Sequence, residues 1–195
     1  MALQLVLASG SPQRRRLLER LGVPFTVRVS GASELEQGRD PAALAVENAL
    51  RKARAALRPG THEAVLGCDT IVVLDGTIYG KPPDAAAARR TLAALGGRTH
   101  EVISGVALLI SGEPAGPANV IERTGVARTR VTFRPIEGEL LERYVATEEW
   151  RDRSGGYAIQ GAGSELALAL DGEEENVVGL PLSTVRELAP ELFGR

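Results

Sequence analysis

The segment from Leu5 to Gly22 places the strongest constraint on how this chain can fold. An apolar run ends at Ser9-Gly10-Ser11, and an arginine-rich helix pattern begins immediately after it. Ser11 is suited to cap this helix, and Pro12 suits its first position, where a missing N–H costs nothing. Gly22 is suited to the left-handed conformation that often follows a helix. The segment therefore predicts a strand, a tight turn and a helix in direct succession.

This strand–turn–helix is a candidate phosphate-binding site. Backbone N–H groups at a helix N-terminus attract anions, and the forked guanidinium groups of Arg14 and Arg15 match phosphate oxygens. The turn is neither a Walker A loop nor a dinucleotide fingerprint, because it lacks both Gly-Lys-Ser/Thr and G-x-G-x-x-G. We interpret Ser9, Ser11 and Arg14 as candidate phosphate ligands. The alternative is an ordinary strand–turn–helix with solvated arginines.

A second candidate site follows the apolar run Ala64–Cys68. Asp69 is expected at the end of that strand, and a hairpin of Ile71–Leu74 and Thr77–Tyr79 is expected after it. Ligands of α/β sheets bind outside the carboxyl ends of strands. Asp69 is therefore a candidate to hold a divalent cation or to activate a water, the alternative being an aspartate that caps a turn.

Strand and helix patterns alternate along the rest of the chain. The expected helices cover residues 41–57 (ended by Pro59-Gly60), 84–95, 137–147 and the stretch from Pro181. Strands are expected over 101–110 and 125–133, and a further hairpin is expected to join 166–170 to 176–178. Residues 154–163 and 112–116 are expected to be loops. Because hairpins exclude a purely parallel sheet, we expect one α/β domain over residues 1–195, with a mixed sheet and flanking helices.

Composition sets broad limits on function. The 195 residues are 44% hydrophobic, enough for one domain with a substantial core, and the net charge of −2 gives no argument for nucleic acid or membrane. Arginines of the cationic first third lie on separate helices without interleaved aromatic residues, so RNA is a weaker ligand than a small polyanion. No apolar run approaches a membrane span, and no signal-peptide pattern opens the chain. Cys68 is the only cysteine, which excludes an intrachain disulfide, and we expect a cytoplasmic protein.

Lysine is rare in this chain. Only Lys52 and Lys81 occur beside 21 arginines. We interpret the two lysines as positions that require a compact ammonium group rather than a guanidinium. Lys52 lies at the edge of an alanine stripe on the helix 41–57, where its stem can follow apolar surface while its head reaches a cleft.

Six motifs in this order resemble the Maf family of nucleoside triphosphate pyrophosphatases, the septum-formation-inhibitor family. They are Leu7-Ala-Ser-Gly-Ser-Pro-Gln-Arg14, Asp69-Thr70, Gly80-Lys-Pro82, Gly97-Arg-Thr-His-Glu-Val102, Gly156-Tyr-Ala-Ile-Gln-Gly161 and Asn176-Val-Val-Gly-Leu-Pro181. The resemblance implies an elongated mixed sheet, a cleft between two lobes, and hydrolysis of a nucleoside triphosphate to the monophosphate and pyrophosphate. It also implies that Asp69 accepts a proton and that Lys52 and Lys81 add charge at the phosphates.

The resemblance further implies how metal and base are bound. Glu34 matches an acidic position that would share Mg²⁺ or Mn²⁺ with Asp69. Gln13, Thr70 and Gln160 match specificity positions, and a glutamine at Gln160 is typical of the dTTP and UTP branch. Gln13 departs from the family's usual arginine, which bears on nucleotide preference.

The sequence leaves open two alternative functions and the oligomeric state. A nucleotide-binding regulator of cell division without turnover has no need of Asp69 as a base, and a house-cleaning pyrophosphatase for modified purine nucleotides would need a different base pocket. His100 is expected to be structural. A homodimer is left open.

Overall fold

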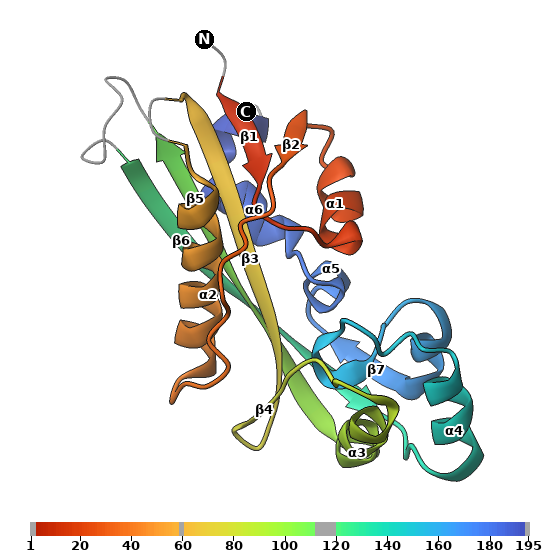
Figure 1. Ribbon diagram of the computed structural model, residues 1–195. Coiled ribbons are helices and arrows are strands. Elements are labelled where there is room, and N and C mark those ends of the chain that lie inside the picture. Colours follow the sequence, from red (N-terminus) through yellow and green to blue (C-terminus); the bar gives the residue numbers. More distant parts are fainter. Residues whose placement is uncertain (1–2, 59–60, 112–119, 194–195) are drawn as a thin grey trace. The chain divides into compact units, whose positions relative to one another are not determined.

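The computed structural model describes residues 3–58, 61–111 and 120–193 (Figure 1). The expected helix end at Pro59-Gly60 and the loop 112–116 lie outside these residues. In chain order the elements are β1 (Gln4–Leu7), α1 (Pro12–Glu19), β2 (Phe25–Val27), α2 (Pro41–Ala56), β3 (Glu63–Leu74), β4 (Thr77–Tyr79), α3 (Ala85–Leu95), β5 (Thr99–Ser111), β6 (Val120–Phe133), α4 (Gly138–Ala146), η2 (Ser154–Gly156), η3 (Gly161–Leu166), β7 (Ala167–Asp171), α5 (Glu174–Val178), α6 (Leu182–Leu188) and α7 (Pro190–Phe193).

The strands form one mixed sheet of seven strands, as the hairpins predict. Its order is β2-β1-β3-β5-β6-β7, and β4 pairs with β3. β1 runs parallel to both β2 and β3, whereas β4 and β7 are antiparallel to β3 and β6. The predicted α/β class with flanking helices is confirmed. Within the described residues, no helix has the length and apolar character needed to cross a bilayer.

The chain divides into two compact units. The first comprises residues 1–69, 104–127 and 179–195, and the second comprises residues 70–103 and 128–178. Each unit has its own apolar cluster, one centred on the inner face of α2 and the other on α3, α4 and the aromatic residues around Phe133. The strands β3, β5 and β6 each contribute residues to both units.

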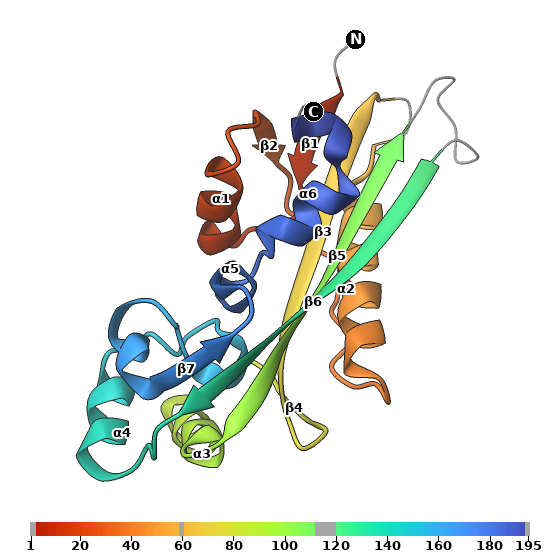
Figure 2. The same ribbon diagram turned by 180° about the vertical axis from the view of Figure 1, so that it is seen from behind.

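In the first unit, α2 and α6 lie on opposite faces of the sheet (Figures 1 and 2). Two glycines bring α2 close to the strands, because a Cβ at Gly67 would collide with the Ala49 carbonyl oxygen and one at Gly105 with the Ala45 backbone. The alanine stripe predicted on α2 supplies the matching flat surface, with Ala49 and Ala53 fully buried. This close approach fixes where the polar residues of α2 meet β3.

In the second unit, the core contains a small aromatic cluster. His100, Phe133 and Tyr157 pack edge to face with ring centroids 4.7 to 5.4 Å apart, and His100 Nε2 lies 2.8 Å from the Tyr157 hydroxyl. The histidine is 1% exposed, so its predicted structural role agrees with its position in the core. The cluster holds the segment that begins at Tyr157 against the strands.

Two sequence predictions differ from the structure, and one strand was missed. The strand 63–74 does not end at Asp69 but continues through it, so the carboxylate lies within β3 rather than beyond its end. β2 was not predicted, because its three residues are too few to show a period. The expected hairpin to 176–178 is wrong: these residues belong to the short helix α5, whose first turn carries acidic Glu174 and Glu175.

Candidate active site

Asp69 is buried within β3 and held by two side chains of α2. Its Oδ1 lies 2.6 Å from Lys52 Nζ, and its Oδ2 accepts a hydrogen bond of 3.0 Å from Asn48 Nδ2. Only 5% of the residue is exposed. A buried carboxylate in mid-strand is costly unless it is paired, and these two partners explain why β3 tolerates it.

Lys52 links two carboxylates. Its Nζ contacts Glu34 Oε1 at 2.6 Å as well as Asp69 Oδ1, and it donates to the Cys68 carbonyl at 3.4 Å. Lys52 is 7% exposed, whereas the Glu34 side chain is 40% exposed. The structure thus brings together three of the predicted site residues, and the predicted position of Lys52 on the alanine stripe is confirmed.

Asn48 is a site residue that the sequence analysis missed. Besides donating to Asp69, its amide accepts a 2.7 Å bond from Leu35 N and donates to Leu35 O at 2.9 Å. It therefore fixes the loop next to Glu34 as well as the carboxylate of Asp69. The available signal was its place one helical turn before Lys52 on a face that otherwise carries alanines.

The turn between β1 and α1 forms a second cluster. Ser11 caps α1, accepting from Arg14 N at 3.4 Å as predicted, and it donates to Gln13 Oε1 at 2.9 Å. Arg14 donates to Ser9 Oγ at 3.3 Å and to the Gly179 carbonyl at 2.8 Å. The predicted phosphate ligands Ser9, Ser11 and Arg14 therefore lie together.

The Gly179 carbonyl connects this cluster to the strand that carries Asp69. It accepts hydrogen bonds from both Arg14 Nε and the Cys68 thiol, the latter at 3.3 Å. Cys68 is a fully buried free cysteine. Gly179 belongs to the motif that ends at Pro181, and sequence reasoning did not assign it a role.

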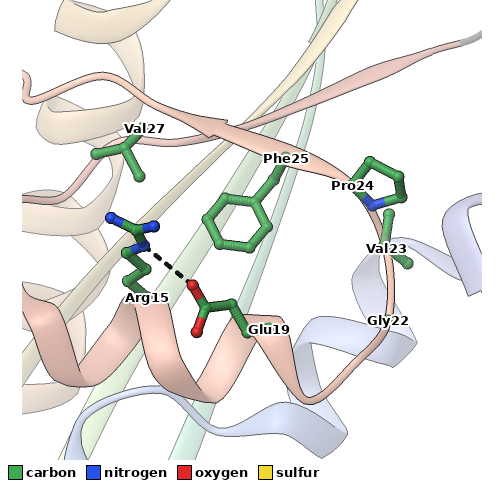
Figure 3. Close-up of a pocket in the computed structure, with 7 residues that line it drawn as sticks. All are labelled: Arg15, Glu19, Gly22, Val23, Pro24, Phe25 and Val27. Carbon is green, nitrogen blue, oxygen red and sulfur yellow. Dashed lines mark hydrogen bonds and ion pairs between the residues drawn. The ribbon is translucent and has the colours of Figure 1, made fainter.

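Arg15 is separate from the candidate phosphate ligands. It forms an ion pair of 3.0 Å with Glu19 across an open hollow between α1 and β2 (Figure 3). The remaining lining of the hollow is Gly22, Val23, Pro24, Phe25 and Val27. None of the predicted site residues lines it, so only Arg14 of the two arginines joins the cluster.

Three predicted site residues belong to the second unit: Thr70, Lys81 and Gln160. The short turn η2 contacts the backbone next to two of them. Ser154 Oγ donates to the Thr70 carbonyl at 2.8 Å, and Gly155 N donates to the Gly80 carbonyl at 3.0 Å. Lys81 and Gln160 are exposed residues.

The carboxylates of the first unit are the candidate ligands for a divalent cation. In the described part of the chain, no group of three or more histidine, cysteine or acidic side chains is placed to hold a metal ion by itself. Asp69 and Glu34 nevertheless both form an ion pair with the same cationic group, the Lys52 ammonium. Their oxygens are hard ligands of the kind that Mg²⁺ and Mn²⁺ prefer, usually completed by substrate phosphates.

Comparison with known proteins assigns the family. The profile of the family described as "Maf-like protein" matches residues 4–192, nearly the whole chain. The chain belongs to the Maf family. Its Asp69–Lys52–Glu34 group and its β1–α1 cluster both lie within the matched range.

Several Maf relatives are similar to this chain over most of their length. A protein of Moorella thermoacetica named dTTP/UTP pyrophosphatase is 50% identical, covering 98% of this chain and 95% of the relative. Proteins with the same name from Anaeromyxobacter sp. and Deinococcus radiodurans are 46% and 43% identical, covering 96% and 95% of this chain and 89% and 91% of the relatives.

Proposed function

We propose that this chain hydrolyses dTTP and UTP to the nucleoside monophosphate and pyrophosphate. Water attacks the α-phosphorus, the bond from that phosphorus to the oxygen bridging to the β-phosphorus breaks, and pyrophosphate leaves. Relatives named dTTP/UTP pyrophosphatase, which match nearly the whole chain, support this substrate class. The observation that carries the reaction type is the buried Asp69 carboxylate, held by Lys52 and Asn48.

Asp69 is the proposed proton acceptor for the attacking water. Lys52 and Asn48 fix its two oxygens, so the carboxylate needs little reorganisation when the proton moves. Its burial keeps competing water away. Lys52 also places positive charge beside the position where phosphate charge develops, which is the main requirement for phosphoryl transfer.

The β1–α1 cluster is the proposed phosphate-binding element. Arg14 is held by Ser9 and by the Gly179 carbonyl, so its guanidinium is oriented before substrate arrives. The capped N-terminus of α1 adds backbone N–H groups and the positive end of the helix dipole. Lys81 of the second unit is proposed to bind phosphate. Thr70 and Gln160 of the second unit and Gln13 of the first are proposed to set base preference.

Asp69 and Glu34 are the proposed ligands of a divalent cation. Both side chains offer carboxylate oxygens, and both already converge on one positive group. Mg²⁺ or Mn²⁺ held there with substrate phosphates would neutralise phosphate charge.

The proposed activity is tested by pyrophosphate release from a panel of pyrimidine and purine nucleoside triphosphates with Mg²⁺ or Mn²⁺. We expect dTTP and UTP to be the best substrates. We expect Asp69→Asn to lower kcat by about 10²–10⁴-fold, the usual contribution of a general base. Asp75→Asn is the matched control, because Asp75 lies exposed in the β3–β4 turn, and it should leave turnover unchanged.

Other outcomes would assign a different function. Tight nucleotide binding without pyrophosphate release would favour a regulator over an enzyme. Faster hydrolysis of inosine or xanthosine triphosphate than of dTTP would favour the house-cleaning alternative.

A further inference from the structure

We infer that Glu174 sets pyrimidine specificity by locking the amide of Gln160 in one orientation. The inference rests on the proposed function, because it assumes that Gln160 meets the base. Gln160 Nε2 donates a hydrogen bond of 2.8 Å to Glu174 Oε1, and both residues belong to the second unit.

The carboxylate decides which end of the amide faces it. An ionised carboxylate only accepts hydrogen bonds, so it attracts the Nε2 end of the glutamine and repels the Oε1 end. Turning the amide by 180° would place the carbonyl oxygen of Gln160 against Oε1 of Glu174. The chemistry of Glu174 therefore fixes the orientation of an amide that is otherwise nearly symmetric.

Both partners are attached to backbone that is held in place. Next to Gln160, Gly161 has a φ of +83°, and Glu149 accepts hydrogen bonds from the backbone N–H groups of Ala162 and Gly163 at 3.3 and 3.4 Å. On the other side, the N–H and carbonyl of Glu173 both bond to Thr129 Oγ1, at 3.1 and 3.0 Å. The side-chain contact thus joins two ordered segments.

The orientation of the amide matters because pyrimidines differ at ring position 3. Thymine and uracil carry an N–H there and an acceptor oxygen at position 4, whereas cytosine carries an acceptor nitrogen and a donor amino group. A glutamine can pair with either base, but the two pairings require opposite orientations of its amide if the ring stays in place. An amide held in one orientation can therefore pair with thymine and uracil while leaving polar groups unpaired when cytosine binds.

The lock is tested by replacing Glu174 with glutamine. The amide of Glu174→Gln both donates and accepts, so it supports both orientations of Gln160. The kcat/KM values for dTTP, UTP, dCTP and CTP are measured for the wild-type protein, Glu174→Gln and Glu174→Ala. Glu175→Gln is the matched control, because it removes the same charge from the same turn of α5.

We expect the wild-type preference for dTTP over dCTP to fall about three- to tenfold in both Glu174 variants, the effect of losing one exposed hydrogen bond to a charged group. The change should come from a higher KM for dTTP and a lower KM for dCTP, with kcat almost unchanged. The Glu175→Gln control should keep the wild-type ratio. A merely structural role for Glu174 would lower activity towards all four nucleotides together.

The outcomes separate the lock from the proposed function. A dTTP preference that persists in Glu174→Gln overturns the lock and leaves the pyrophosphatase proposal intact. A wild-type protein that hydrolyses dTTP and dCTP equally well overturns the dTTP/UTP preference together with the lock. A ratio that changes equally in Glu175→Gln shows a general charge effect and also overturns the lock.

Discussion

At the scale of single residues, the surroundings of Lys52 are unlike those of a surface lysine. It is 7% exposed and lies 2.6 Å from both Asp69 and Glu34. Lys52→Met keeps the apolar stem but removes the charge. We expect kcat to fall about 10²–10³-fold, as for the loss of one charge-stabilising group. We also expect the free energy of unfolding to fall by about 3 kcal/mol, because the Asp69 carboxylate stays buried without its ammonium partner.

Three further variants serve as controls in activity assays and urea unfolding. Lys52→Arg should lose activity as Lys52→Met does, because a planar guanidinium does not fit where the Asp69 and Glu34 oxygens both contact one ammonium nitrogen. Lys81→Ala should lower kcat/KM with little effect on stability, because Lys81 is exposed. Arg58→Ala, also exposed, should change neither quantity. Equal small effects in all variants would contradict the special role assigned to lysine.

His100 makes the stability of the protein depend on pH. Burial lowers the pKa of His100 from 6.5 to about 4. Between these values the unfolded chain binds a proton that the folded protein does not bind, so the stabilising contribution is present above pH 6.5 and is lost as the pH falls toward 4. The free energy of unfolding should drop by about 3 kcal/mol over this range. Urea unfolding at a series of pH values measures the slope.

His100→Gln is the variant that isolates this effect. The amide of glutamine offers the Tyr157 hydroxyl a hydrogen-bond partner but does not titrate. Glu63 contributes a slope of the same sign: burial would raise the pKa of its carboxyl, but hydrogen bonds from Arg28 and Arg58 outweigh burial and lower it. The difference between wild type and His100→Gln removes this contribution. Identical slopes in both proteins would exclude His100 as the titrating group.

The sequence predicted some site residues better than others. Lys52 stood out because lysine is rare here, and its contact with Asp69 follows from its helix face. The only signal for Asn48 was its place one helical turn before Lys52, and this signal is weak because an isolated asparagine on a helix usually faces solvent. The Gly179 carbonyl was out of reach of sequence reasoning, because a backbone oxygen leaves no trace in residue type.

At the scale of elements, the contact of α2 with β3 positions the candidate catalytic group. Gly67 lies against the Ala49 and Ala53 backbone of α2, so Gly67→Ala would push the helix away from the strand. We expect a loss of about 2 kcal/mol or more in the free energy of unfolding, typical of overpacking. Activity should fall too, because Lys52 and Asn48 move with α2. Urea unfolding and pyrophosphate release measure the two effects.

Gly80→Ala is the matched control for stability. Among the residues that the structure describes, none beyond the two chain neighbours of Gly80 has a heavy atom within 4 Å of the position that its Cβ would take, and its φ is not positive. It should therefore unfold like the wild type. A Gly67→Ala protein that is as stable as Gly80→Ala would contradict the close helix–strand contact.

The elements themselves were predicted unevenly. The long helices α2 and α3 and the β3–β4 hairpin follow from period and turn chemistry, and Asp75-Gly76 adopts the expected positive φ values. The segment 176–178 was misassigned, because three residues cannot separate a strand from a helix. In the structure Asn176 lies within α5 and donates to the Val102 carbonyl and to Thr129 Oγ1, contacts that residue types alone do not show.

At the scale of the whole molecule, sequence pattern predicted the class of the fold but not its division into two units. The mixed sheet followed from the hairpins. The division depends on which residues of β3, β5 and β6 pack with which helices, and one continuous apolar strand carries no mark where its partners change. The expected cleft between two lobes stays a prediction, and so does the single domain over residues 1–195.

The single domain predicts one cooperative unfolding transition. β3, β5 and β6 each supply residues to both units, so neither unit keeps a complete set of strands if the other unfolds. Two unique residues report on the units separately: Trp150, 2% exposed in the second unit, and Cys68, fully buried in the first. Trp150 fluorescence and Cys68 thiol labelling should therefore give the same urea midpoint.

The Gly67→Ala protein makes this test sharper. Its substitution lies in the first unit, yet a single cooperative transition requires the Trp150 and Cys68 midpoints to shift by the same amount, since both signals then report one free energy of unfolding. A shift confined to Cys68 labelling, with Trp150 fluorescence unchanged, would show that the two units unfold independently and that the chain comprises two domains.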